Sequence, residues 1–104
     1  MDLEQKIIQD IKASMLARDI LKLEVCRSIK SAIILAKSEK GFAGIDNTKE
    51  VEILQKLYKQ RREAYKIYLS QKRIDLAEYE DAQSKIIATY LPEQYSLKEL
   101  EELI

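Results

Sequence analysis

Apolar residues recur every three or four positions along most of this chain, which is the spacing of amphipathic helices. The first such stripe consists of Ile7, Ile8, Ile11 and Met15. Asp2 and Gln5 resemble a capping box and predict where this first helix begins. The pattern breaks at Arg18 and Asp19, so we expect the helix to end there.

A second helix is predicted over residues 20–40, with Asp19 as its N-cap. Its main apolar stripe consists of Val25, Ile29, Ala32, Ile33 and Ala36. Ile20, Leu23 and Ile34 fall on nearly the opposite side at 100° per residue. A helix that is apolar all round is usually central in its domain. The alternative interpretation makes Leu23 and Ile34 part of a face that binds a partner protein or a second copy of the chain.

Gly41 to Gly44 form the only clear loop, and Gly41 suits the residue after a helix end. Asn47 and Glu50 then resemble a capping box, which predicts a third helix over 48–72. Arg61 lies near the centre of the apolar stripe of this helix. The aromatic residues Tyr58, Tyr65 and Tyr68 share that stripe, and they are either core residues or stacking surfaces for nucleic-acid bases.

A short connector at 73–75 leads to a fourth predicted helix, which Asp75 and Glu78 open as a capping box and Pro92 ends. Its apolar residues are Leu76, Tyr79, Ile86, Ile87, Tyr90 and Leu91. Ser96 predicts the cap of a final element, and the sequence stops inside it.

The chain has 104 residues with only two glycines and one proline, a composition that favours helices over a sheet rich in turns. We therefore predict an all-α fold in which two antiparallel helical hairpins pack as a small multihelical domain, with a C-terminal helical stub. The expected division is a helical N-terminal domain over 1–92 and the start of a truncated helical module over 93–104.

The net charge of zero hides a strong asymmetry along the chain. Residues 56–73 contain seven basic residues and one acid, whereas residues 74–104 contain two basic residues and eight acids. Such a division is either an internal electrostatic clasp or a basic surface that is offered to a polyanion.

Individual charges on the third helix point to both interpretations. Arg61 needs a partner in the apolar stripe, because an unpaired buried charge costs several kcal/mol. Glu80 is the preferred partner for a structural ion pair, and Asp75 is the second choice.

The other cations of the third helix gather on one flank of it. Lys59, Arg62 and Lys66 are spaced i, i+3, i+7, and Arg73 joins them if the helix continues that far. A row of cations of this kind can follow a phosphate backbone, although charged rows are commonly just solvated helix faces.

Candidate chemistry is sparse. The sequence has no histidine, its single cysteine is Cys26, and it has no glycine-rich phosphate loop. We therefore expect no metal, no cofactor and no catalytic residue. No apolar run has the roughly 20 residues needed to cross a membrane, so we expect a cytoplasmic protein without a membrane partner.

Four short motifs in order resemble the YqeY family, the small bacterial proteins of the GatB/YqeY group. The motifs are Met15-Leu-Ala-Arg-Asp19, Lys59-Gln-Arg-Arg62, Arg73-Ile-Asp-Leu-Ala77 followed by Glu80, and Tyr90-Leu-Pro-Glu-Gln94. The resemblance implies an all-helical N-terminal domain. It also implies a following module similar to the tail of the B subunit of the glutamine-dependent aminoacyl-tRNA amidotransferase, a tail that helps recognise tRNA.

The sequence thus predicts a non-catalytic, tRNA-associated accessory module, for which an amidotransferase-like activity is implied by resemblance only. Its predicted phosphate contacts are Lys59, Arg62, Lys66 and Arg73. The alternative is a protein-interaction or oligomerisation module that uses Leu23 and Ile34.

Overall fold

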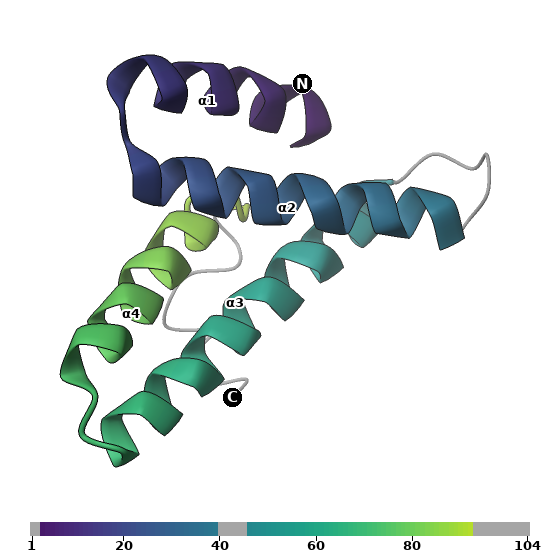
Figure 1. The fold of residues 1–104 in the computed structure, drawn as a ribbon. Helices are drawn as coiled ribbons and strands as arrows, with labels where there is room; N and C mark the ends of the chain where they lie inside the picture. The colour runs from purple at the N-terminus through teal and green to yellow at the C-terminus, as the bar shows by residue number, and fades with distance from the viewer. Residues whose placement is uncertain (1–2, 40–45, 93–104) are drawn as a thin grey trace. The chain divides into compact units, whose positions relative to one another are not determined.

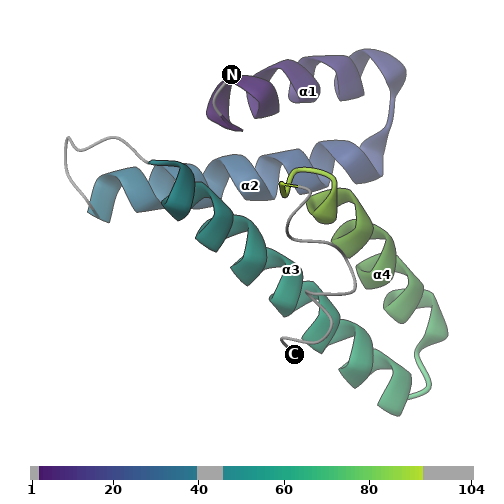
Figure 2. The same cartoon turned by 180° about the vertical axis from the view of Figure 1, so that it is seen from behind.

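The computed structural model describes residues 3–39 and 46–92, and these residues form an all-α fold, as predicted (Figure 1). The helices are α1 (Leu3–Ala17), α2 (Ile20–Glu39), α3 (Asn47–Ser70) and α4 (Ile74–Ala88). They form two antiparallel hairpins, α1–α2 and α3–α4, which are seen from both sides in Figures 1 and 2. The chain divides into two compact units, Met1–Ile53 and Leu54–Ile104, so the first residues of α3 belong with α1 and α2.

The apolar core of the first unit lies where α1 packs against α2. Its fully buried side chains include Ile7, Val25, Cys26 and Ile29. Ile33 and Ala36 extend the buried side of α2, so the predicted main stripe of this helix is the one that faces the core. Burial of several aliphatic side chains on one helix face supplies most of the free energy that stabilises such a hairpin.

The predicted stripe of α1 is partly wrong. Ile7 is buried, but Ile8 and Met15 are exposed, and Leu3 and Ser14 lie on the buried side instead. Residues 3, 7 and 14 are close to one line along an α-helix, whereas residue 15 is turned about 100° from residue 14. The prediction placed Met15 in the core because it is hydrophobic, whereas the smaller Ser14 is the residue that is buried.

The turn between α1 and α2 is built around Arg18, which adopts a left-handed conformation with φ of 58°. Its N–H donates to the Met15 carbonyl at 3.2 Å, and the Asp19 N–H donates to the Ser14 carbonyl at 2.9 Å. These two bonds form a Schellman motif, which satisfies the last carbonyls of α1. Asp19 then caps α2 as predicted, because its Oδ1 accepts from the Lys22 N–H at 3.1 Å.

The turn between α3 and α4 repeats this geometry around Lys72, which has a φ of 61°. The Lys72 N–H donates to the Leu69 carbonyl at 3.0 Å, and the Arg73 N–H donates to the Tyr68 carbonyl at 2.8 Å. Helix α4 begins at Ile74 with Arg73 as its N-cap and no capping bond from a side chain. The capping box predicted at Asp75 is therefore wrong.

Helix α3 begins one residue earlier than predicted, and Asp46 caps it instead of Asn47. Oδ1 of Asp46 accepts from the Lys49 N–H at 2.8 Å. Glu50 is thereby free of a capping role in its own helix, and its Oε2 accepts from the Leu3 N–H at 3.0 Å. The carboxylate thus satisfies a backbone donor in the first turn of α1.

Several predicted features lie outside the described residues. They include the capping role of Asp2, the loop at Gly41, the final element after Ser96 and the second predicted domain over 93–104. The boundary at residue 92 stays a prediction.

Candidate nucleic-acid interface on α3

Helix α3 carries two kinds of cation that differ in where they lie. Arg61 and Arg62 are partly buried beside α4, whereas Lys59 and Lys66 are exposed. The apolar side of the helix is set by Leu54 and Tyr58, which are almost fully buried. Tyr58 is therefore a core residue and offers no stacking surface to a base.

Arg61 bonds to α4 through a residue that the sequence analysis did not single out. Its Nε donates to Oε1 of Gln83 at 2.6 Å, while Oε2 of Glu80 lies 3.8 Å from the same nitrogen. That Glu80 oxygen is buried and has no hydrogen-bond partner in the described part of the chain. Asp75, the second choice, pairs with Arg73 at 3.5 Å. Gln83 was detectable in principle, because it lies three residues after Glu80 and so points to a similar side of α4.

Arg62 makes two contacts with α4 and a third with its own helix. Its Nη1 donates to Oδ1 of Asp81 at 2.6 Å, and Oγ of Ser84 lies 3.4 Å from the same atom. The guanidinium carbon stands 4.4 Å from the centre of the Tyr65 ring, within the range of a cation–π interaction. Only 15% of the Arg62 side chain is exposed. Arg62, which was predicted to contact phosphate, is thus bound to an acidic residue of the same hairpin.

Asp81 holds two cations at once. Besides Arg62 it pairs with Lys85, whose Nζ lies 3.0 Å from Asp81 Oδ2. The hydrogen bond from Lys85 and, secondarily, the one from Arg62 hold the pKa of Asp81 below its ordinary value of 3.8, although partial burial acts in the opposite direction. Asp81 is therefore a carboxylate at neutral pH, and the contact between α3 and α4 is an ion pair.

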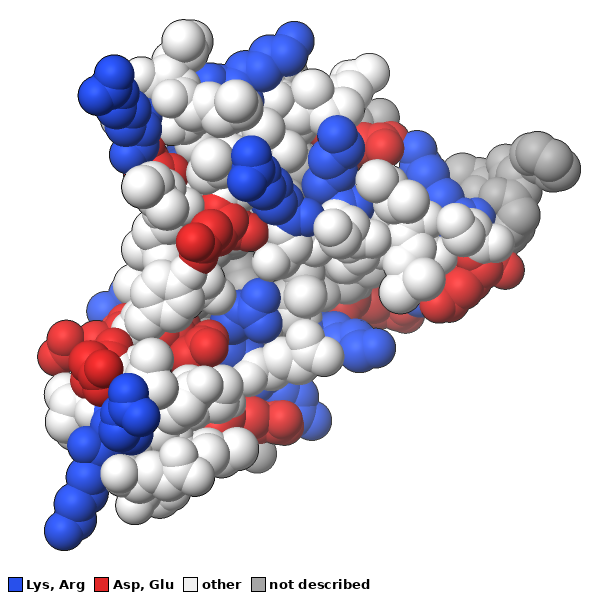
Figure 3. Space-filling view, viewed as in Figure 1, with Lys and Arg blue, Asp and Glu red and all other residues white. Residues whose placement is uncertain are grey.

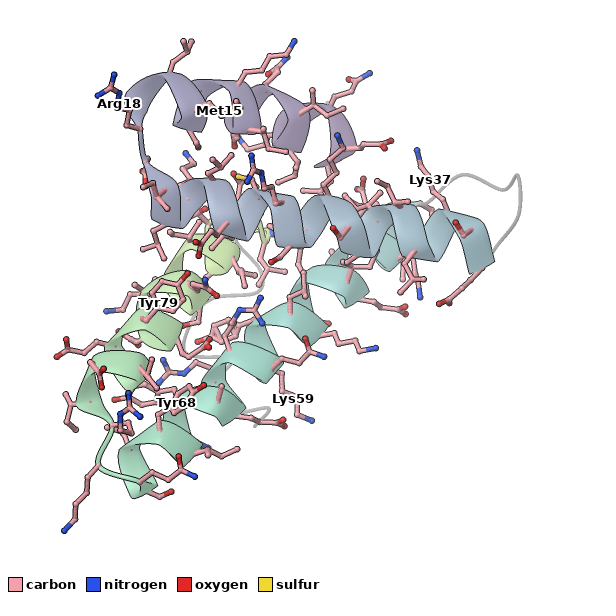
Figure 4. The ribbon with its side chains drawn as sticks, viewed as in Figure 1. Met15, Arg18, Lys37, Lys59, Tyr68 and Tyr79 are labelled. Carbon is pink, nitrogen blue, oxygen red and sulfur yellow. The ribbon has the colours of Figure 1, made fainter. Side chains whose placement is uncertain are left out.

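Lys59 and Lys66 differ from the arginines in having no ion-pair partner among residues 3–39 and 46–92. In Figure 4, Lys59 extends from α3 on the side away from α4. Lys66 follows seven residues later, on the same flank and about 10 Å farther along the helix axis.

The flank of Lys59 and Lys66 is less purely basic than the sequence suggested. Glu63 is exposed as well, four residues after Lys59 and three before Lys66, so it adjoins both lysines. Figure 3 likewise shows acidic and basic side chains side by side along the α3–α4 hairpin.

Arg73 does not extend the row of cations. Helix α3 ends at Ser70, and the left-handed Lys72 redirects the chain before Arg73. The Arg73 side chain is exposed and contacts Asp75, whose pKa is lowered by the hydrogen bond from Arg73. The row that remains on one flank of α3 is Lys59, Arg62 and Lys66.

The predicted partner face of α2 is exposed in part. Ile34 is half exposed, and Ile20 and Leu35 are exposed still further, whereas Leu23 is half-buried. The polar side chain of Arg27 is exposed between the two apolar ends of this face. The face is therefore two small apolar areas and no continuous stripe.

No group of three or more residues able to hold a metal ion occurs in the described ranges. No helix in those ranges is both long enough and apolar enough to span a bilayer.

Comparison with known proteins identifies the family of this chain. The model of the YqeY-like protein family matches residues 4–104. A protein from the yeast Vanderwaltozyma polyspora, named "Altered inheritance of mitochondria protein 41, mitochondrial", is 35% identical over 83 residues, which cover 80% of this chain and 45% of that protein. The protein of the same name from Meyerozyma guilliermondii is 35% identical over 88 residues, covering 80% of this chain and 43% of its own length. This chain thus spans less than half the length of either relative.

Proposed function

Because this chain belongs to the YqeY family, we propose that it is a non-catalytic accessory module that contacts tRNA through the exposed lysines of α3. The observation that carries the proposal is the position of Lys59 and Lys66, which share one flank of α3 and face solvent without an ion-pair partner in the described residues. The likeness of the family to the amidotransferase tail makes tRNA the first nucleic acid to test.

Lysine suits a contact of this kind. Its ammonium group is a hydrated point charge on a flexible stem, so it can follow a phosphate backbone without a fixed geometry. Two lysines that each neutralise one phosphate give a log–log salt slope of about −1.8 on a duplex. The affinity should then fall about tenfold between roughly 50 and 200 mM salt, which is a weak interaction with a clear signature.

The test is a titration of labelled bulk tRNA at those two salt concentrations. We expect Lys59→Glu combined with Lys66→Glu to abolish binding while the helical content measured by circular dichroism stays unchanged. The matched control reverses Lys6 and Lys12, two exposed lysines of α1, and so changes the net charge by the same amount. Equal losses in both variants would mean that overall charge, and not α3, governs binding. Unchanged binding in the α3 variant would remove this flank as the site.

A second candidate function is a protein-interaction module that uses the outer side of α2, favoured by the exposure of Ile34 and Leu35. Exposed aliphatic side chains on one helix face are a common feature of protein interfaces. Ile34→Asp should then dissociate an oligomer or partner complex, as measured by sedimentation velocity, with the helical content retained. Leu23→Asp is the less suitable variant, because that side chain is already partly buried.

A further inference from the structure

We propose that Asp81 competes with nucleic-acid phosphate for Arg62, so that the contact between α3 and α4 and the binding of tRNA oppose each other. This inference rests on the proposed function and assigns a regulatory contact to the same flank of α3. In the sequence Arg62 is the middle cation of a row with Lys59 and Lys66, but in the structure its side chain bonds to α4.

Lys59, Arg62 and Lys66 are spaced i, i+3, i+7, which places them within about 60° of one another around the helix. The outer two are exposed. The guanidinium of the middle one is directed to α4, where Asp81 Oδ1 lies 2.6 Å from its Nη1. A rotation of the Arg62 side chain, without any movement of the helix, would place a third cation between the two lysines.

The carboxylate of Asp81 and a backbone phosphate are equivalent ligands for this guanidinium. Both offer anionic oxygens to the planar donors of arginine, and both form charge-assisted hydrogen bonds that are stronger than neutral ones. A phosphate that approached the flank between Lys59 and Lys66 would therefore offer Arg62 the same kind of bond that Asp81 now provides.

Two features of the hairpin make the exchange feasible. Asp81 would keep Lys85, whose Nζ lies 3.0 Å from its second carboxylate oxygen, so Asp81 stays paired when Arg62 is released. Arg61 would keep its bond to Gln83 at 2.6 Å, so α3 and α4 stay joined while Arg62 turns away. Release would cost the bond to Asp81, the contact with Ser84 and the contact with the Tyr65 ring.

Competition of this kind is reciprocal. If the bond between Asp81 and Arg62 lowers the affinity for tRNA by some factor, bound tRNA weakens that bond by the same factor. Removing the carboxylate should therefore allow Arg62 to join the two lysines. The affinity for tRNA should rise several-fold at low salt. The salt slope should steepen by about 0.7 to 0.9, the increment that one more neutralised phosphate gives.

The decisive experiment measures the salt dependence of tRNA binding for the wild-type chain, Asp81→Asn and Asp75→Asn. Asp75 is the matched control, because it is an exposed acid of the same helix paired with an arginine, and its replacement changes the net charge equally. We expect a steeper slope for Asp81→Asn only. Adding Arg62→Gln to Asp81→Asn should restore the wild-type slope.

The outcomes separate this inference from the proposed function. Wild-type binding that depends on Lys59 and Lys66, together with equal slopes for Asp81→Asn and Asp75→Asn, would overturn the competition alone. A steeper slope that survives Arg62→Gln would also overturn it. Absence of tRNA binding by the wild-type chain and by Asp81→Asn at low salt would overturn both.

A measurement on the unmodified chain keeps the inference testable if Asp81→Asn disturbs the hairpin. Arginine side chains labelled with ¹⁵N report on their own contacts in solution. On addition of tRNA, the Nε signal of Arg62 should shift while that of Arg61 stays in place. Shifts of both signals, or of neither, would contradict an exchange confined to Arg62.

Discussion

The α1–α2 and α3–α4 hairpins are both antiparallel and both turn through a left-handed basic residue, yet different contacts hold them together. Between α1 and α2 most of the buried side chains are aliphatic, with Ile7 and Ile29 fully buried, and one ion pair joins Lys37 to Glu4. Between α3 and α4 the described contacts include hydrogen-bonded ion pairs and amides, such as Arg62 with Asp81 and Arg61 with Gln83. Apolar contacts are non-directional and have no charge that salt can screen or pH can titrate, whereas ionic contacts respond to salt, pH and competing ions. The second hairpin is therefore the one suited to respond to a polyanion.

The largest expected effect lies in the apolar hairpin. Ile29→Ala should lower the free energy of unfolding by about 2–4 kcal/mol, because it leaves a cavity at a fully buried site. Ile34→Ala on the exposed side of the same helix should cost less than about 1 kcal/mol. Urea denaturation followed by circular dichroism measures both values. Similar losses would mean that both sides of α2 are buried in solution.

The next effect concerns the partner of Arg61. Double-mutant cycles with Arg61→Gln should give a coupling of about 1 kcal/mol for Gln83→Ala and a smaller one for Glu80→Ala. The reason is distance, since the Arg61 Nε is 2.6 Å from the Gln83 oxygen and 3.8 Å from that of Glu80. The reverse order would mean that Glu80, which pairs with Arg61 as predicted from the sequence, is the stronger of the two partners.

A pH dependence should distinguish the ionic hairpin. The pKa of Asp81 in the folded chain lies below 3.8, so its carboxylate stabilises the folded state above about pH 4 to 5. That contribution is lost as the pH falls through the folded pKa. The difference in unfolding free energy between the wild-type chain and Asp81→Asn should thus be constant near neutrality and shrink below about pH 4. A difference that is flat across this range would show that Asp81 is not stabilised as an anion.

The smallest expected effect is at the turns. Lys72→Gly should raise the midpoint of thermal unfolding by a few degrees, because glycine adopts the left-handed conformation of residue 72 without steric cost. The gain is limited to about 0.5–1 kcal/mol, since glycine also increases the entropy of the unfolded chain. Arg18→Gly should act alike in the other hairpin. A lowered midpoint would mean that these side chains contribute contacts of their own.

The sequence predicted the helices well because their signals are local. The N-cap at Asp19 and the buried stripe through Val25 and Ile29 follow from spacing and capping preferences that act over a single turn. At Asp46 the same rule gave the wrong residue, since two neighbouring residues both suit an N-cap.

The candidate site was less predictable, because it depends on contacts between helices. Helix angles placed Arg62 on one flank with Lys59 and Lys66 but gave no information on α4. A flexible guanidinium can turn toward either side, and only the position of Asp81 shows which side it takes. The role of Gln83 was missed for the same reason, since a neutral amide gives no charge signal.

The most direct test of this division between arginines and lysines compares the unfolding free energies of Arg62→Gln and Lys59→Gln. Both substitutions remove one positive charge from the same face of α3. We predict that Arg62→Gln lowers the free energy of unfolding by about 1–2 kcal/mol, whereas Lys59→Gln changes it by less than about 0.5 kcal/mol. Equal changes would contradict the account, since they would mean that Arg62 is as free as the lysine beside it.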